Sequence, residues 1–200
     1  MWFIFAFIAA IIFDLQYSIG RFGGDSQERE PKPIERKETE MFDFFKKKNK
    51  NQVLGSPVKG TAVPLSEVND PTFSEGMLGD GAAVIPSEGK IYAPADGEIA
   101  MVFGTLHAIS LTTEFGAEIL IHIGLDTVKM EGEGFTAHVE AGNEVKKGDL
   151  LIEVDLDKVK AAGYDTITPV LVCNTDEFAS VKGMTGNVNP GDDLVIIETK

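Results

Sequence analysis

Short apolar segments alternate with turn-forming residues along most of the chain. From residue 53 onward these segments are separated by Gly, Pro, Asn and Asp, at about the 8–12 residue spacing of all-β domains. Segment 155–162 has a helical signature, with Asp155 as the N-cap and Gly163 as the stop signal. The pattern predicts an all-β fold, an antiparallel β-sandwich or flattened barrel with at most one or two short helices. The predicted strands are 82–85, 97–103, 107–112, 117–123, 150–154, 170–173 and 194–198.

Two stretches of the sequence share a Gly-Asp turn that leads into a predicted strand. The stretch VKKGDLL at 145–151 aligns with VNPGDDL at 188–194. All-β proteins reuse favoured turn sequences, so the similarity has two interpretations, repeated turn chemistry and internal duplication. The sequence leaves both open.

The first 52 residues have a different composition from the rest of the chain. Residues 2–13 are all apolar, but a bilayer-spanning helix needs about 20 residues. Their flanks also lack the basic residues and the small-residue cleavage site of a secretory signal. Residues 20–40 are rich in Gly, Pro, Glu, Lys and Arg, which indicates a linker. We therefore predict a non-core extension at 1–40, a short basic amphipathic tail at 41–52 and one folded domain at 53–200.

The chain is acidic, with 32 Asp and Glu against 18 Lys and Arg and a formal net charge of −14. Such a protein repels a nucleic-acid backbone and suits a partner with a basic face. No arginine follows Arg36, so the predicted domain lacks the bidentate side chain that most often holds a phosphate. Cys173 is the only cysteine, which excludes an internal disulfide and a thiolate zinc cluster and fits a reducing compartment.

Two of the three histidines fall on consecutive predicted strands. His107 begins one strand and His122 lies near the end of the next. A two-residue turn centred at 114–115 would join these strands as a hairpin. In that register His107 is opposite His122, with Cβ atoms about 4.5–5.5 Å apart, and Ile109 is opposite Leu120. The sequence thus predicts two touching imidazole rings, on the condition that this turn sets the register.

A facing pair of imidazoles has a specific chemistry. Double protonation of adjacent rings is costly, which favours neutral rings near neutral pH, and a neutral ring nitrogen is a nucleophile. The pair could also contribute to a zinc ion shared with another protein, but zinc usually takes three or four protein ligands and no further His or Cys is near in sequence. His138 has no histidine partner and is interpreted as an exposed bystander. We predict no required metal and no cofactor.

The sequence around His122 resembles a known motif. Residues 116–128, GAEILIHIGLDTV, followed by GEGF at 132–135, are similar to the phosphohistidine motif of the glucose-type IIA family of the bacterial sugar phosphotransferase system. Further matches lie at 79–81, 93–97, 105–107, 168–170 and 186–197. The resemblance covers about residues 53–200, and it identifies that segment as a phosphotransferase IIA domain.

The resemblance implies a phosphoryl carrier with an antiparallel β-sandwich fold. His122 would accept the phosphoryl group through Nε2 from the small histidine-containing carrier protein HPr and pass it to the IIB domain of a glucose-type sugar permease. His107 would be the supporting histidine, and Thr105 would orient its ring. The implied docking surface combines an apolar rim with two acids that meet basic partner residues: Phe73, Phe103, Leu120, Val128, Asp70 and Asp126. The protein would work in the cytoplasm, associated with the membrane through its permease.

Other interpretations remain at this stage. Residues 142–151 and 154–159 look like the hairpin that presents a lipoylated lysine, although Lys158 falls in the predicted helix. A pure interaction module is a further alternative. Residues 1–40 are interpreted as sequence upstream of a true start at Met41, as the remnant of a fused permease, or as a membrane anchor. The resemblance identifies neither the sugar, nor the permease, nor any enzymes that the protein would regulate.

Overall fold

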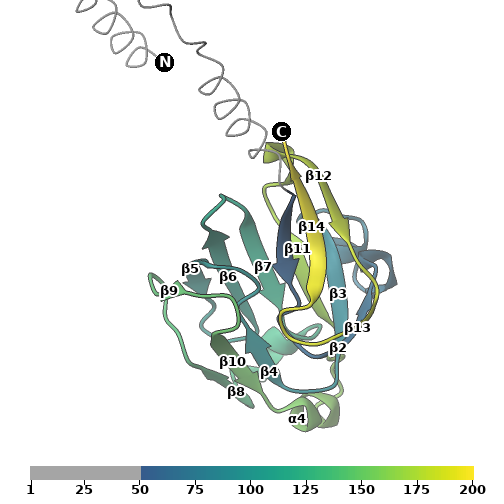
Figure 1. Cartoon of the computed structure of the whole chain (residues 1–200). Helices are drawn as coiled ribbons and strands as arrows, with labels where there is room; N and C mark the ends of the chain where they lie inside the picture. Colours follow the sequence, from purple (N-terminus) through teal and green to yellow (C-terminus); the bar gives the residue numbers. More distant parts are fainter. Residues whose placement is uncertain (1–50) are drawn as a thin grey trace, which may run out of the picture. The chain divides into compact units, whose positions relative to one another are not determined.

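The computed structural model describes residues 51–200, whose regular secondary structure consists mainly of antiparallel strands joined by turns and loops (Figure 1). The predictions for residues 1–50 lie outside the described residues. Every one of the seven predicted strands corresponds to an observed strand, and the described residues add two short α-helices. The prediction of an all-β antiparallel fold is confirmed. No helix within residues 51–200 is long and apolar enough to cross a bilayer.

The largest sheet has eight strands, and all of its neighbouring strands pair antiparallel. Figure 1 shows its central strands running side by side through the domain. In spatial order its strands are β13 (Gly186–Val188), β2 (Gly60–Val63), β3 (Asp80–Pro86), β11 (Thr168–Val172), β7 (Glu118–His122), β6 (Ala108–Thr113), β5 (Gly97–Val102) and β9 (Glu144–Val145). The two middle strands, β11 and β7, come from distant parts of the chain and pair antiparallel.

Two sheets of three strands complete the β-structure. One contains β1 (Gln52–Gly55), β14 (Asp193–Thr199) and β12 (Phe178–Gly183), and the other contains β4 (Lys90–Tyr92), β10 (Leu150–Val154) and β8 (Phe135–Ala137). Fully buried side chains from all three sheets form one hydrophobic core. Its large members include Leu54, Ile91, Ile99, Ile109, Ile121, Leu151 and Leu194. The three sheets therefore form a flattened sandwich around a single core.

Side chains on the outer face of the large sheet form a second, smaller cluster. Because successive residues of a strand point to opposite faces, Val170 faces the main core and Leu171 faces outward. The outer cluster also contains Phe73 from helix α3 (Pro71–Ser74), with Leu120 of β7 packed against it. His122 follows Leu120 by two residues on β7, so it lies on this same outer face.

Helix α4 (Leu156–Ala161) ends where the sequence predicted. The Asp155 carboxylate caps it by accepting a hydrogen bond of 3.1 Å from the backbone N–H of Lys158. After the helix, Gly163 has a left-handed φ of 86°, which suits glycine at a helix end. Lys158 therefore lies inside a helix and not at the tip of a hairpin, which argues against the lipoyl-carrier interpretation.

The two Gly-Asp turns have the same local structure. In each, the carboxylate of the Asp (Asp149 or Asp192) accepts a hydrogen bond of 2.8 Å from the backbone N–H three residues earlier. The preceding glycines, Gly148 and Gly191, have φ values of 95° and 88°. Because side chains with a Cβ are strained in this region, both turns need glycine at this position.

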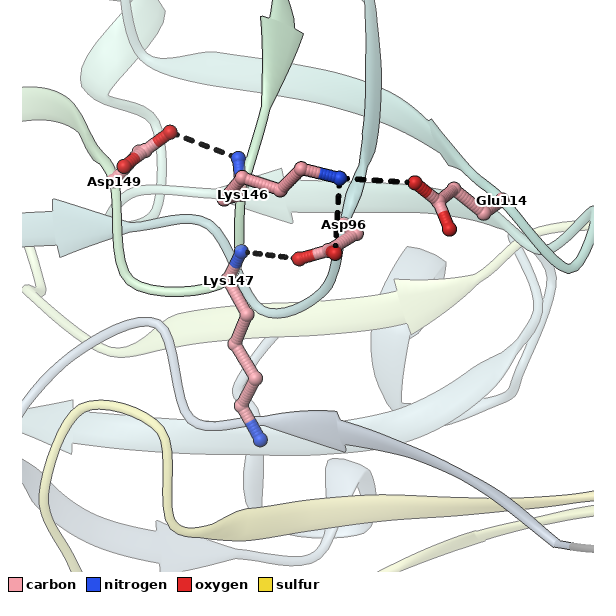
Figure 2. Close-up of polar contacts among 5 residues, drawn as sticks. All are labelled: Asp96, Glu114, Lys146, Lys147 and Asp149. Carbon is pink, nitrogen blue, oxygen red and sulfur yellow. Dashed lines mark hydrogen bonds and ion pairs between the residues drawn. The ribbon is translucent and has the colours of Figure 1, made fainter.

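A polar cluster holds the first of these turns against the large sheet (Figure 2). The Lys146 ammonium contacts carboxylate oxygens of Asp96 at 3.1 Å and Glu114 at 3.0 Å. The backbone N–H of Lys147 donates to Asp96 at 2.8 Å, while Asp149 closes the turn from the other side. The backbone hydrogen bond from Lys147, followed by the bond from Lys146, lowers the pKa of Asp96. These groups are all exposed, so the cluster serves mainly to fix geometry.

The strand arrangement supports internal duplication. The order of the large sheet is symmetric about the β11–β7 pair, with β13, β2 and β3 on one side matching β9, β5 and β6 on the other. The two three-stranded sheets match in the same way, since β1, β14 and β12 correspond to β4, β10 and β8. The contiguous half, 90–154, is thus inserted between the two parts of the other half, 52–86 and 168–199. Reused turn chemistry alone would not repeat the order of the strands.

The predicted hairpin register between β6 and β7 is wrong by one residue. Ala108, not His107, is opposite His122, and Ile109 is opposite Ile121 instead of Leu120. The reason is the loop, which has three residues, 114–116, instead of two, and its last residue is a glycine with a φ of 89°. A left-handed glycine at the end of a three-residue loop is a standard hairpin geometry, and it shifts every opposed pair by one.

Candidate functional site

The rings of His107 and His122 are in contact despite the shifted register. Their centroids are 5.1 Å apart, and the ring planes meet at 78° in an edge-to-face arrangement. His107 lies just before β6, where its carbonyl accepts a 2.7 Å hydrogen bond from the backbone N–H of Ile123. Leu106 has a left-handed φ of 56°, so regular alternation of side chains stops before His107. The two rings therefore meet as diagonal neighbours and not as directly opposed residues. The predicted contact is confirmed, although the register that predicted it is not.

A backbone carbonyl fixes which nitrogen of His122 carries a proton. Nδ1 of His122 lies 2.7 Å from the carbonyl oxygen of Gly124. A carbonyl can only accept, so Nδ1 is the donor in this bond. In a neutral ring Nε2 then keeps its lone pair, which is the form needed for nucleophilic attack.

Thr105 occupies the position that the resemblance implied for it. Its hydroxyl oxygen lies 2.6 Å from Nδ1 of His107. A hydroxyl can donate or accept, so this bond holds the orientation of the ring in either tautomer. His107 is largely buried, and the Thr105 contact satisfies one of its two ring nitrogens.

Two phenylalanines pack against the histidine pair. The Phe73 ring lies 5.0 Å from the His122 ring, and the Phe103 ring lies 5.3 Å from the His107 ring, centroid to centroid. Phe73 is only 4% exposed, so it supports His122 more than it forms an open rim. Aromatic contacts of this kind restrict the orientation of the rings and exclude water from one side of them.

Asp70 has a structural use that its sequence position did not reveal. Its carboxylate accepts a 2.8 Å hydrogen bond from the backbone N–H of Thr72, which caps helix α3. Pro71 occupies the first turn of that helix, where its missing N–H is not needed. Asp70 and Pro71 together build the short helix that places Phe73 against His122.

The remaining docking residues differ in exposure. Leu120 and Phe103 are half-buried, whereas Val128 is 45% exposed. Two further apolar side chains, Met77 and Leu78, are exposed just after α3, and the sequence analysis did not select them. The signal that could have identified them is their position in a Gly-flanked turn, where burial of two apolar side chains is not expected.

Asp126 already has a cationic partner within the chain. It has a left-handed φ of 59° and precedes the 3₁₀ helix η2 (Thr127–Met130). The Lys129 ammonium lies 2.9 Å from its carboxylate, and both side chains are more than half exposed. Exposed pairs of this kind contribute little stability, so a basic partner residue can compete with Lys129 for the carboxylate.

Burial lowers the pKa of both site histidines. For His122 the largest cause is desolvation, and the adjacent His107 lowers its pKa further. The hydrogen bond to Gly124 and the charges of Asp70 and Asp126 act in the opposite direction on the pKa of His122. Desolvation is also the cause that lowers the pKa of His107. Both rings are therefore neutral at pH 7.

These depressed values predict how the protein responds to acid. Phosphoryl acceptance by His122 should be constant from neutral pH down to its usual pKa of 6.5 and fall only below that value. The unfolded chain binds protons on these histidines at higher pH than the native protein does, so their contribution to stability is present above pH 6.5 and is lost as the pH falls through the native values. NMR titration of the ring signals measures this, and a His122 pKa above 6.5 would contradict it.

No cluster of three or more His, Cys, Asp or Glu side chains within residues 51–200 is placed to hold a metal ion. The prediction that no metal is required stays a prediction. His138, the third histidine, lies apart from the pair and contacts Glu153 at 2.9 Å on the exposed surface. Its interpretation as a bystander agrees with this position.

Three comparisons with known proteins give a consistent result. The family model described as phosphoenolpyruvate-dependent sugar phosphotransferase system, EIIA 1, matches residues 52–178. The beta-glucoside-specific EIIBCA component of the PTS system from Bacillus subtilis (strain 168) is 50% identical over 148 residues, which is 73% of this chain and 24% of that protein. The chain thus spans about a quarter of the length of this relative.

Among solved structures, glucose permease IIA from Mycoplasma capricolum matches with a TM-score of 0.68 and 38% sequence identity. The match covers 74% of this chain and 96% of that one. It therefore extends over nearly the whole of that solved chain. The chain belongs to the EIIA 1 family of the phosphoenolpyruvate-dependent sugar phosphotransferase system.

Proposed function

We propose that this protein carries a phosphoryl group on Nε2 of His122, between phosphorylated HPr and the IIB domain of a sugar permease. The observation that supports this most strongly is the bond from Nδ1 of His122 to the Gly124 carbonyl, because it leaves the lone pair on Nε2 next to a second imidazole. Family membership supplies the class of reaction, phosphoryl transfer within the sugar phosphotransferase system.

The transfer needs only bond exchange at phosphorus. The lone pair on Nε2 of His122 attacks the phosphorus in line with the phosphorus–nitrogen bond of the donor. As the new bond forms, the old one breaks, and its electron pair returns to the nitrogen of the donor. The reverse sequence of events delivers the group to the acceptor. Catalysis then depends on positioning and on stabilising the negative charge of the transferred group.

His107 is placed to stabilise that charge. If the Thr105 hydroxyl donates to Nδ1 of His107, the ring proton lies on Nε2 and can be donated to a phosphoryl oxygen. A neutral donor of this kind binds the phosphoryl group less tightly than an arginine would, and no arginine occurs in residues 51–200. Weak binding suits a carrier, because the group has to leave again.

The exposed apolar side chains and acids near the pair supply a docking surface for two partners in turn. Val128 provides open apolar area, and Asp70 and Asp126 provide negative charge. HPr and the IIB domain would both present apolar and basic groups to this surface. A protein that docks on a permease works at the cytoplasmic side of the membrane, which is the localisation that we propose.

The first acceptor to test is a β-glucoside-type permease, because the Bacillus subtilis relative is named for that substrate. The full chain is incubated with labelled phosphoenolpyruvate, the general phosphotransferase proteins and purified IIB domains of β-glucoside and glucose permeases. We expect label on this protein first and then on IIB, with the faster transfer to the β-glucoside type. Absence of label on this protein would refute the carrier function, whereas equal transfer to both acceptors would refute only the sugar preference.

A further inference from the structure

The carbonyl that orients His122 belongs to an irregular loop. Strand β7 ends at His122, and the chain then turns sharply at Gly124, which has a φ of 74°. The His122 Nδ1–H bond ends on the carbonyl of this same glycine. The tautomer and the orientation of the His122 ring therefore depend on how firmly the two peptide groups on either side of Gly124 are held in place.

Both of these peptide groups are held by other parts of the chain. The Leu125 N–H, in the peptide after Gly124, donates a 3.0 Å bond to the carbonyl of Asp165. The Ile123 carbonyl, in the peptide before it, accepts a 2.5 Å bond from the hydroxyl of Thr127. Of these two anchors, only Thr127 acts through a side chain, so it can be removed without changing the backbone.

Thr127 also restricts the loop by contact. A Cβ placed on Gly124 would lie 2.6 Å from the Thr127 methyl carbon and 2.6 Å from the Asp165 carbonyl oxygen. The glycine is therefore enclosed between these two groups, and the loop has little room to move. Thr127 itself has no exposed surface. Burying a hydroxyl is unfavourable unless it is hydrogen-bonded, and valine would fill the same space, so packing alone does not account for a threonine here.

We propose that Thr127 is a positioning residue for phosphoryl transfer. Its hydroxyl holds the Ile123–Gly124 peptide so that the Gly124 carbonyl receives the Nδ1–H of His122 and Nε2 points toward the phosphoryl group. The role in transfer rests on the proposed carrier function, whereas the effect on the His122 tautomer does not. Groups bonded directly to a metal-bound imidazole change metal affinity or activity by about 10- to 100-fold, and Thr127 acts one step further away, through the peptide next to Gly124, so we expect the lower end of this range.

Wild type and three variants distinguish the effect of the Thr127 hydroxyl from the effect of the rest of its side chain. Wild-type Thr127 and Thr127→Ser keep it, while Thr127→Val and Thr127→Ala lose it. Serine and alanine both lack the methyl group, so they form a matched pair that differs only in the hydroxyl. Valine matches threonine in volume. If Thr127→Val does not fold, the serine and alanine pair still isolates the hydroxyl.

The first measurement is nitrogen NMR of the unphosphorylated, ¹⁵N-histidine-labelled full chain. We expect His122 to be protonated at Nδ1 in wild type and Thr127→Ser, and to show a mixture of tautomers in the variants without the hydroxyl. The second is the rate of phosphoryl acceptance from phosphorylated HPr, which should fall about tenfold on going from serine to alanine. Unchanged tautomer and unchanged rate in the alanine variant would overturn the proposal.

These measurements keep the two proposals apart. If wild type accepts no phosphate, the carrier function fails, but the NMR tautomers still decide whether Thr127 orients His122. If wild type is phosphorylated and the alanine variant loses the tautomer but not the rate, the positioning role in transfer is refuted. Thr127 would have only a packing role if the serine and alanine variants lost the same thermal stability and if His122 stayed protonated at Nδ1 in both.

Discussion

Replacing His122 with Ala is expected to abolish phosphoryl acceptance. The substitution removes the only nitrogen in the site that is fixed as a nucleophile, with Nδ1 held by Gly124 and Nε2 free. The rate should fall by roughly 10⁴-fold or more, as for other catalytic nucleophiles. The measurement is the yield of acid-labile, base-stable phosphate after incubation with phosphorylated HPr.

The matched control for this variant is His138→Ala. His138 is the remaining histidine outside the pair, and it lies on the exposed surface beside Glu153. Its replacement should leave acceptance unchanged within about twofold, since exposed ion pairs contribute little. Labelling of His122→Ala at the wild-type rate, or loss of labelling in His138→Ala, would reverse the assignment of the nucleophile.

Replacing His107 with Gln is expected to separate acceptance from onward transfer. Glutamine keeps a hydrogen-bond donor and leaves His122 and its Gly124 bond in place, so the protein should still accept phosphate within about tenfold of the wild-type rate. The glutamine amide does not hold its donor where the imidazole oriented by Thr105 holds its own, so transfer to the IIB domain should fall by about 10²- to 10³-fold, the range seen when a donor to a developing negative charge is removed or misplaced. Single-turnover experiments in each direction measure the two rates.

Two outcomes would contradict this division of roles. If His107→Gln could not be phosphorylated while His122→Ala could, the two histidines would have exchanged roles. If transfer to IIB were as fast as in wild type, the imidazole of His107 would contribute nothing to transfer that an amide donor cannot supply. Thr105→Val is a useful companion, because it removes the 2.6 Å contact to Nδ1 of His107 and leaves both rings in place. We expect it to impair transfer in the same direction and to a smaller extent.

The strands that the sequence predicted are those with continuous apolar runs. Strands β3, β6, β7, β10, β11 and β14 each contain two or more buried positions, β5 contains one, and helix α4 has a clear cap and stop. Most of the strands that were missed are short, such as β9 (Glu144–Val145) and β13 (Gly186–Val188) with two and three residues, although β12 (Phe178–Gly183) has six. They form because they pair with longer neighbours, and local sequence carries little sign of such pairing.

For the histidine pair, the sequence predicted the contact between the rings but not the strand register that produces it. Its contact was predicted, but through a register that is wrong, because the glycine at the end of the β6–β7 loop was not recognised as a third loop residue. The diagonal contact depends on the left-handed backbone of Leu106, and no residue type there signals it. Sequence alone supports the proximity of His107 and His122 less securely than the structure does.

The groups that hold His122 and its neighbours in place could not be predicted from the sequence. The Gly124 carbonyl is a backbone acceptor, and backbone groups have no residue-specific signature. The capping role of Asp70 became visible only with helix α3, whose four residues are too few for a periodic pattern. Thr127 was part of the recognised motif, yet its hydroxyl partner, the Ile123 carbonyl, is evident only from the path of the loop.

The strand order is repeated in the two halves of the fold, but the histidine pair lies in one half only, at the centre of the large sheet. The β11–β7 pair lies at the centre of the strand order, and His122 is on β7 at that centre. The residue paired with the neighbouring Leu120 across this centre is Leu171, an apolar residue of the outer cluster. One half of the fold thus carries the histidines, and the matching half supplies the apolar surface behind them.

The most direct test of the central claim is to locate the phosphoryl group by NMR. The full chain, labelled with ¹⁵N-histidine, is phosphorylated by HPr, and the coupling between phosphorus and the ring nitrogens is measured. We predict a one-bond coupling to Nε2 of His122 and none to Nδ1 of that ring. A coupling to Nδ1 of His122, or to either nitrogen of His107 or His138, would contradict the account.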